Sequence, residues 1–174
     1  MGNIFKFVFH ICLLTIWVFL TSGSKTETLV KPNEGISSNV SYVPYKNVGE
    51  KLLYFSEEMV TWFKANAICR TMKGHLVSIE NYSVWNAINE HLKTKPKNYY
   101  WWISANDLDS EGKFIWANTG TPMDYAVWRQ GEPNDREKNE DCVHLILENG
   151  RYEMNDFRCR YPINFICERE SVDK

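Results

Sequence analysis

The sequence predicts an α+β fold with two helices in its first half, short strands after them and a long irregular segment. The first observation is a helical spacing of apolar residues over 61–72 and again over 83–92. The second is a set of short runs rich in aromatic and β-branched residues, which are typical of strands. The third is the stretch 117–141, where no period holds. Helices that precede most strands, rather than alternating with them, indicate an α+β arrangement.

The two predicted helices have recognisable apolar faces. Thr61 can cap the first helix, and Gly74 is a natural stop after it. The apolar face of the first helix contains Trp62, Ala65, Ile68, Cys69 and Met72. The apolar face of the second contains Val84, Trp85, Ile88 and Leu92.

Six short stretches are predicted strands, at 76–79, 100–104, 113–116, 142–147, 152–154 and 164–168. His144 alternates with the core positions of its strand, so we expect it to face solvent. The irregular stretch between 117 and 141 is long enough to be either functional or disordered. We expect it to be ordered, because it begins near Trp116, contains Trp128 and is anchored at Cys142. Four tryptophans are expected in the core: Trp101, Trp102, Trp116 and Trp128.

The first residues resemble a secretory signal peptide. Lys6 precedes an apolar run over 7–20, and small residues follow it at 21–24. A membrane anchor is the alternative, but the run is short for a span of roughly 20 residues. We therefore expect secretion to the extracellular space without membrane insertion. The predicted organisation is a signal peptide over 1–23, a flexible leader over 24–41, a globular domain over 42–170 and a tail over 171–174.

The cysteines fit a secreted protein. Cys12 lies in the predicted signal peptide, which leaves Cys69, Cys142, Cys159 and Cys167 in the mature chain. Four cysteines in an oxidising compartment suggest two disulfides, with three possible connectivities. Zinc is a poor alternative because there is no CxxC motif and the histidines are scattered. The sequons at Asn39 and Asn81 are candidate N-glycosylation sites, which also fits secretion.

The stretch GEPNDREKNEDC, residues 131–142, concentrates oxygen-bearing side chains. Like charges repel one another, so an ordered segment of this kind needs a partner for its carboxylates. Calcium is such a partner, since it takes six to eight oxygen ligands from carboxylates, amide carbonyls and water. Asn155 and Asp156 form a second group shortly before Cys159. The acidic stretch itself offers Glu132, Asn134, Asp135, Glu140 and Asp141.

These residues carry a resemblance to the C-type lectin domain family, in its short form with two disulfides. The resemblance covers roughly residues 42–169, and the joint spacing of its motifs is specific. The matching motifs are Trp102-Ile103-Ser104, Glu132-Pro133-Asn134, Asn139-Glu140-Asp141-Cys142, Asn155-Asp156 and Phe165-Ile166-Cys167-Glu168. The chain departs from the family pattern at Met154, where the family usually has tryptophan. We expect this change to alter packing rather than to abolish calcium binding.

The resemblance implies a pairing of the cysteines, a binding site and a ligand. The implied disulfides are Cys69–Cys167 and Cys142–Cys159, and the peptide before Pro133 is implied to be cis. A sugar-binding calcium would be held by Glu132, Asn134, Glu140, Asn155 and Asp156. A second, structural calcium would be held by Asp107, Glu111, Asp135, Glu140 and Asp141. The order Glu-Pro-Asn goes with mannose-type sugars in this family, namely mannose, fucose and N-acetylglucosamine. The implied partners are glycans or glycoproteins that end in such sugars.

Other functional classes fit less well. The net charge of −2 and the lack of a Lys/Arg-rich run argue against a nucleic-acid partner. A calcium loop of the EF-hand type would place Asn118 where a bidentate Glu is required. A glycosidase would need an acid in an apolar pocket, whereas these acids cluster on a polar loop, so we expect no enzyme. The remaining alternative is a secreted protein-binding module or inhibitor of the same fold. The leader shows no heptads or Gly-X-Y repeats that would predict an oligomer.

Overall fold

The computed structural model describes residues 45–95 and 100–169. The predicted signal peptide, leader and tail, together with the sequon at Asn39, lie outside the described residues. Within the described part of the chain, no helix is long and apolar enough to cross a membrane.

The order of elements confirms the α+β prediction. Two helices, α1 and α2, occupy Trp62–Thr71 and Tyr82–Leu92, and a short 3-10 helix, η1, occupies Arg136–Lys138. The strands are β1 Lys46–Val48, β2 Lys51–Phe55, β3 His75–Leu76, β4 Trp101–Asn106, β5 Ile115–Trp116, β6 Cys142–Glu148, β7 Arg151–Phe157 and β8 Asn164–Arg169.

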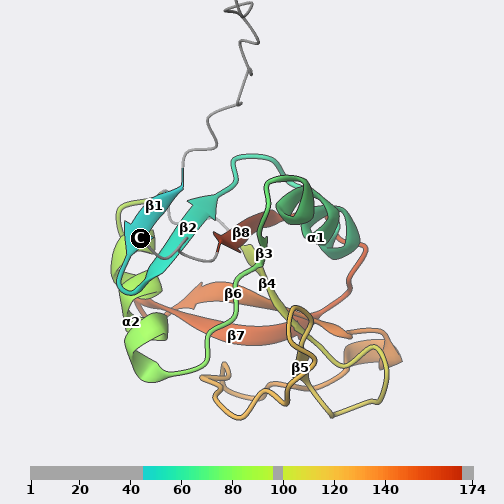
Figure 1. Cartoon of the computed structure of the whole chain (residues 1–174). Helices are drawn as coiled ribbons and strands as arrows, with labels where there is room; N and C mark the ends of the chain where they lie inside the picture. The colour runs from blue at the N-terminus through green and yellow to red at the C-terminus, as the bar shows by residue number, and fades with distance from the viewer. Residues whose placement is uncertain (1–44, 96–99, 170–174) are drawn as a thin grey trace, which may run out of the picture. The chain divides into compact units, whose positions relative to one another are not determined.

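The strands pair in the order β1-β2-β8-β4-β6-β7, with β3 beside β8 and β5 beside β4. Only the β4–β8 pair is parallel among the described pairs of strands. The β6–β7 hairpin is the most extensively paired, and Figure 1 shows its two long strands side by side. Its turn is Asn149-Gly150, both with positive φ (49° and 82°), which is the backbone that a tight hairpin turn requires.

Both helices begin at a side-chain cap. Thr61 Oγ1 accepts from the backbone N–H of Lys64 at 3.3 Å, as predicted. Asn81 Oδ1 accepts from the N–H of Val84 at 3.0 Å, so α2 begins at Tyr82, one residue earlier than predicted. Asn81 is exposed, and this cap uses its amide oxygen rather than the nitrogen that would carry a glycan.

Gly74 is required for a reason that the sequence did not indicate. The left-handed residue after α1 is Lys73, with φ 59°. A Cβ on Gly74 would lie 2.3 Å from the carbonyl oxygen of Glu168 in β8. Glycine therefore allows the chain to pass close to β8 as it leaves the helix.

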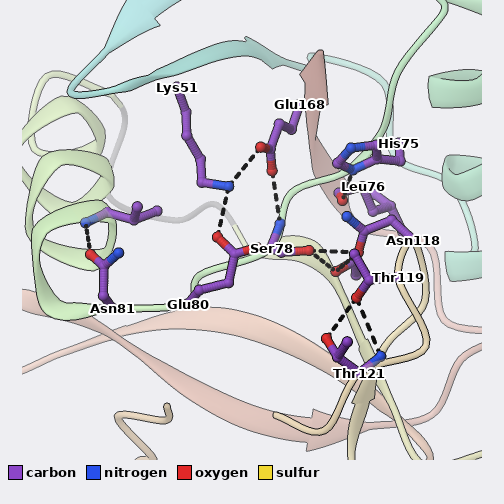
Figure 2. Close-up of polar contacts among 12 residues, drawn as sticks. Lys51, His75, Leu76, Ser78, Glu80, Asn81, Asn118, Thr119, Thr121 and Glu168 are labelled. Carbon is purple, nitrogen blue, oxygen red and sulfur yellow. Dashed lines mark hydrogen bonds and ion pairs between the residues drawn. The ribbon is translucent and has the colours of Figure 1, made fainter. Parts of the chain in front are cut away.

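A polar network ties the loop after β3 to the rest of the domain (Figure 2). Lys51 Nζ contacts Glu168 Oε1 at 2.6 Å and Glu80 Oε2 at 3.0 Å. The other oxygen of Glu168 accepts from the N–H of Ser78 at 3.2 Å. The hydroxyl of Ser78 donates to Asn118 Oδ1 at 2.7 Å. The network thus connects β2, β8 and the start of the irregular segment.

The core forms two clusters, and the tryptophans are placed largely as predicted. Trp101 and Trp116 are buried in the first cluster, and Trp128 packs against it while partly buried. Trp102 is buried in the second cluster, beside the cysteines.

Both implied disulfides are confirmed. Cys69 in α1 is bonded to Cys167 in β8, across a sequence separation of 98. Cys142 at the start of β6 is bonded to Cys159 just after β7, across a separation of 17. The first disulfide closes most of the domain into one loop, and the second joins the two ends of the β6–β7 hairpin.

Candidate functional site

The irregular segment after β5 is fixed to β7 by backbone hydrogen bonds. The N–H of Met154 donates to the carbonyl of Val127 at 2.7 Å, and the N–H of Arg129 donates to the carbonyl of Met154 at 2.8 Å. Trp128, between them, packs on Phe114 with ring centroids 5.1 Å apart. The segment is ordered, as predicted, and these contacts place the residues that follow Arg129 beside the C-terminal half of β7.

Met154 itself lies in the core. Its side chain is fully buried among the residues of the first cluster. Its backbone anchors the irregular segment on one side, so the residue contributes packing and hydrogen bonds rather than a ligand. Asn155 and Asp156 follow within the same strand, which runs to Phe157 and is longer than predicted.

Asp156 organises the loop that carries the Glu-Pro-Asn motif. The Glu132–Pro133 peptide is cis. Beyond it, the N–H of Asn134 lies 3.2 Å and 3.0 Å from the two carboxylate oxygens of Asp156. The N–H of Asp135 donates to the same carboxylate at 2.7 Å. Asp156 is 1% exposed, and a buried carboxylate needs hydrogen-bond partners. The backbone N–H groups of the loop are these partners.

A pocket of about 260 Å³ opens between this loop and the β6–β7 hairpin. Its lining includes Glu132, Asn134, Glu140 and Asn155, which are four of the five residues expected to hold the sugar-binding calcium. Asp156, the fifth, is not part of the lining, but its carboxylate contacts the backbone N–H of Asn134. The structure therefore brings together residues that are up to 24 positions apart in sequence.

Glu140 is held in place from both sides. Its side chain accepts from the N–H of Arg136 at 3.1 Å, and its own N–H donates to Asp135 Oδ1 at 3.3 Å. Burial raises the pKa of Glu140, and the nearby charge of Asp156 adds to this effect, while the Arg136 hydrogen bond opposes it. Burial and the neighbouring Asp156 also raise the pKa of Glu132. Arg129 opposes the rise at Glu132, since its Nη1 lies 3.7 Å from Glu132 Oε1. The crowding of the carboxylates still favours a cation among them.

A second acidic group lies around Asp107. Asp107 is 2% exposed, and its Oδ2 accepts from the N–H of Gly112 at 2.8 Å. Its Oδ1 is buried and has no hydrogen-bond partner among the described residues. Burial raises the pKa of Asp107, and so does the charge of Asp141. Desolvation and the charges of Asp107, Asp135 and Asp141 raise the pKa of exposed Glu111.

The side chains of both acidic groups offer ligand atoms of the kind that calcium prefers. They offer only carboxylate and amide oxygens, which are the ligands of a hard cation, and one buried oxygen of Asp107 lacks a partner. Over residues 45–95 and 100–169, no three His, Cys, Asp or Glu side chains already meet as a metal site. The amide of Asn134 donates instead to Glu132, and that of Asn155 to the carbonyl of Asp156.

The expectation that His144 faces solvent is wrong. The side chain is 3% exposed and lies among the rings of Tyr100, Trp102 and Phe157, with centroids 5.6, 5.8 and 5.1 Å away. Burial lowers the pKa of His144 to about 3, so the ring is neutral at physiological pH. Its Nε2 lies 3.1 Å from Asn155 Nδ2. Alternation failed as a guide because aromatic residues cover this face of β6 as well.

Comparisons with known proteins agree with this architecture. The family model described as the lectin C-type domain matches residues 58–169. The chain is 35% identical over 117 residues to the hepatic lectin of Gallus gallus, covering 67% of this chain and 53% of that protein. It is 32% identical over 121 residues to C-type lectin 37Db of Drosophila melanogaster, covering 70% and 79%. The chain thus spans about half the length of the chicken protein, and 39% of the mouse low affinity immunoglobulin epsilon Fc receptor.

Solved structures of C-type lectin domains are also similar to this chain. The carbohydrate-recognition domain of the mouse scavenger receptor C-type lectin is 34% identical, with a TM-score of 0.64, covering 74% of this chain and 97% of that one. The corresponding domain of cow CD23, solved in the presence of a GlcNAc2Man3 oligosaccharide, is 32% identical, with a TM-score of 0.63 and coverage of 74% and 95%. With its two disulfides and its fold, this chain belongs to the C-type lectin domain family.

Proposed function

We propose that this protein is a secreted, calcium-dependent lectin that binds mannose-type sugars and has no enzymatic activity. The observation that carries the proposal is the pocket in which Glu132, Asn134, Glu140 and Asn155 meet. Asp156 supports them from behind through the loop backbone. Such a set of acids and amides suits both a hard cation and the hydroxyls of a sugar.

The proposed role of each residue follows from its donors and acceptors. Calcium would supply open coordination positions for two vicinal hydroxyl oxygens of the sugar. Glu132 and Glu140 would accept the protons of those hydroxyls, because a carboxylate is an acceptor only. Asn134 and Asn155 would donate to the same hydroxyl oxygens through their amide nitrogens. Asp156 would complete the set of oxygen ligands. The mixture of acids and amides is needed because acids alone could not donate.

A second ion would be held by the group around Asp107. The residues proposed to hold it are Asp107, Glu111, Asp135, Glu140 and Asp141. Asp135 and Glu140 already touch, since the Glu140 N–H donates to Asp135. Their connection would couple this ion to the order of the sugar-binding loop.

The proposed partners are glycans or glycoproteins with terminal mannose, fucose or N-acetylglucosamine. The cow CD23 domain, solved in the presence of GlcNAc2Man3, supports a ligand of this class. Secretion is supported by the N-terminal sequence and by the two disulfides, which persist in oxidising compartments.

A mannose matrix tests the proposal directly. The protein is expected to bind it in millimolar calcium and to be released by a chelator or by free mannose. A single calcium-dependent monosaccharide contact should be weak, with a dissociation constant near 1 mM, or about −4 kcal/mol. Retention that is unaffected by the chelator would contradict calcium dependence. Elution by galactose as readily as by mannose would contradict the proposed sugar class.

Exchanging the acid and the amide of the motif should change the sugar preference. The double change Glu132→Gln with Asn134→Asp swaps which side of the bound hydroxyl pair accepts and which donates. A mismatched buried hydrogen bond costs about 1–3 kcal/mol, so mannose should bind about 5- to 150-fold more weakly relative to galactose. Calcium binding should persist, because the number of oxygen ligands is unchanged. Competition between the two sugars measures the preference.

The chain offers a matched control for this exchange. Glu137 and Asn139 have the same residue types and the same spacing, and neither lines the pocket. The change Glu137→Gln with Asn139→Asp should leave the preference as in the wild type. An equal shift in both double variants would mean that loop charge, rather than the motif, sets the preference.

A further inference from the structure

One side of the pocket is built from rings that play no part in holding calcium. Tyr100, His144, Phe157 and Tyr161 form a continuous series, which we call the aromatic row. Successive ring centroids lie 5.6, 5.1 and 5.2 Å apart. The rings come from just before β4, from β6, from the end of β7 and from the loop after β7. The row therefore crosses the sheet next to the proposed sugar site.

The aromatic row and the proposed calcium ligands share one pocket. All four rings line the space of about 260 Å³ that Glu132, Asn134, Glu140 and Asn155 also line. His144 is directly opposite Asn155 in the β6–β7 register, so the row and that amide occupy the same face of the sheet. Ile146, two residues after His144, extends the apolar wall.

The row leaves apolar surface in water next to a polar site. Tyr100 is 44% exposed and Tyr161 is 54% exposed. The pocket is thus mixed in character, with the aromatic row and Ile146 on one side and polar groups that include Arg129 and Arg136 beside the proposed calcium ligands. Its volume is slightly below the roughly 300 Å³ at which pockets for drug-sized ligands begin. It therefore suits a small ligand group next to the proposed calcium ligands.

The chemistry of the wall indicates which group that is. Phe157 and Ile146 carry no hydrogen-bonding atoms, and the His144 ring is packed among aromatic neighbours. A second pyranose would leave the hydroxyls that face Phe157 and Ile146 without partners, and each unpaired polar group is costly to bury. An apolar ring would instead pack on the aromatic faces and remove them from water.

We propose that the aromatic row is a subsite for an apolar aglycone attached to the sugar held at the proposed calcium site. The subsite rests on the proposed function, because the sugar positions the aglycone. The preferred ligands are accordingly glycosides in which a mannose-type sugar carries an aromatic or aliphatic group at its anomeric oxygen.

Calorimetry with methyl α-mannoside and phenyl α-mannoside tests the subsite. In the wild type, the phenyl glycoside is expected to bind about tenfold more tightly, as shielding about half of a phenyl ring from water would give. Tyr161→Ser should reduce this ratio towards one. Tyr82→Ser is the control, because Tyr82 is 63% exposed, lies on α2 and does not line the pocket. This control should keep the tenfold ratio.

The possible results separate the subsite from the sugar site. If both glycosides bind the wild type equally, the subsite is wrong while the proposed function stands. If the phenyl preference survives Tyr161→Ser or disappears in Tyr82→Ser, the aromatic row is not its source, and the inference fails. If neither glycoside binds in calcium, the proposed function fails and the subsite fails with it.

Discussion

Replacing both Cys69 and Cys167 with alanine is expected to lower the free energy of unfolding by about 4–5 kcal/mol. The bond closes a loop with a sequence separation of 98, so its loss restores much conformational freedom to the unfolded chain. A loss of this size is comparable with the whole stability of many domains, which is about 5–15 kcal/mol. Denaturant unfolding of the purified protein measures the change, and the secreted yield should fall with it.

The other disulfide provides the comparison. Replacing both Cys142 and Cys159 opens a loop with a separation of only 17, for which the same model predicts about 3 kcal/mol. This pair also joins the two ends of the hairpin that carries Asn155 and Asp156. Its loss should therefore weaken sugar binding more than the loss of the Cys69–Cys167 disulfide does. Equal losses of stability in the two double variants would contradict the loop-length argument.

The helices could be predicted because their signals are local. Thr61 precedes an apolar face at helical spacing, and the structure uses its hydroxyl as the cap. The strands β1 and β2 gave no comparable signal. Only Val48 and Leu53 are buried in these two short strands, so the alternation of apolar residues is too weak to detect. Their place in the sheet depends on pairing with β8, which is distant in sequence.

In the candidate site, too, the residues marked by local motifs could be predicted, whereas the long-range contacts could not. The identities of Glu132, Asn134 and Asp156 follow from short motifs, and the structure brings these residues together. The sequence did not reveal that Asp156 accepts from the loop backbone, because these hydrogen bonds join groups 22 and 21 residues apart and no local pattern marks them, unlike the cap at Thr61. Nor did it reveal the aromatic row, whose members are spread over 62 residues from Tyr100 to Tyr161 and meet only through the strand register.

Replacing Asp156 with alanine is expected to weaken sugar binding at least about 100-fold. The change removes a proposed calcium ligand and also the acceptor for the N–H groups of Asn134 and Asp135. Hydrogen bonds to a charged group contribute about 1.5–3 kcal/mol each, so the loop loses two of its attachments to β7 while the ion loses a proposed ligand. Because calcium stabilises a fold only through the sites that bind it, the increase in melting temperature on adding calcium should also shrink.

Asp124→Ala is the matched control for this change. Asp124 is an exposed aspartate of the same irregular segment, and it does not line the pocket. Its removal takes away the same charge, so a purely electrostatic effect of the acidic segment would appear in both variants. We expect Asp124→Ala to bind the mannose matrix like the wild type and to keep the full calcium-dependent rise in melting temperature. If Asp156→Ala is retained by the matrix as strongly as Asp124→Ala, then Asp156 neither holds the ion nor positions the loop for sugar binding.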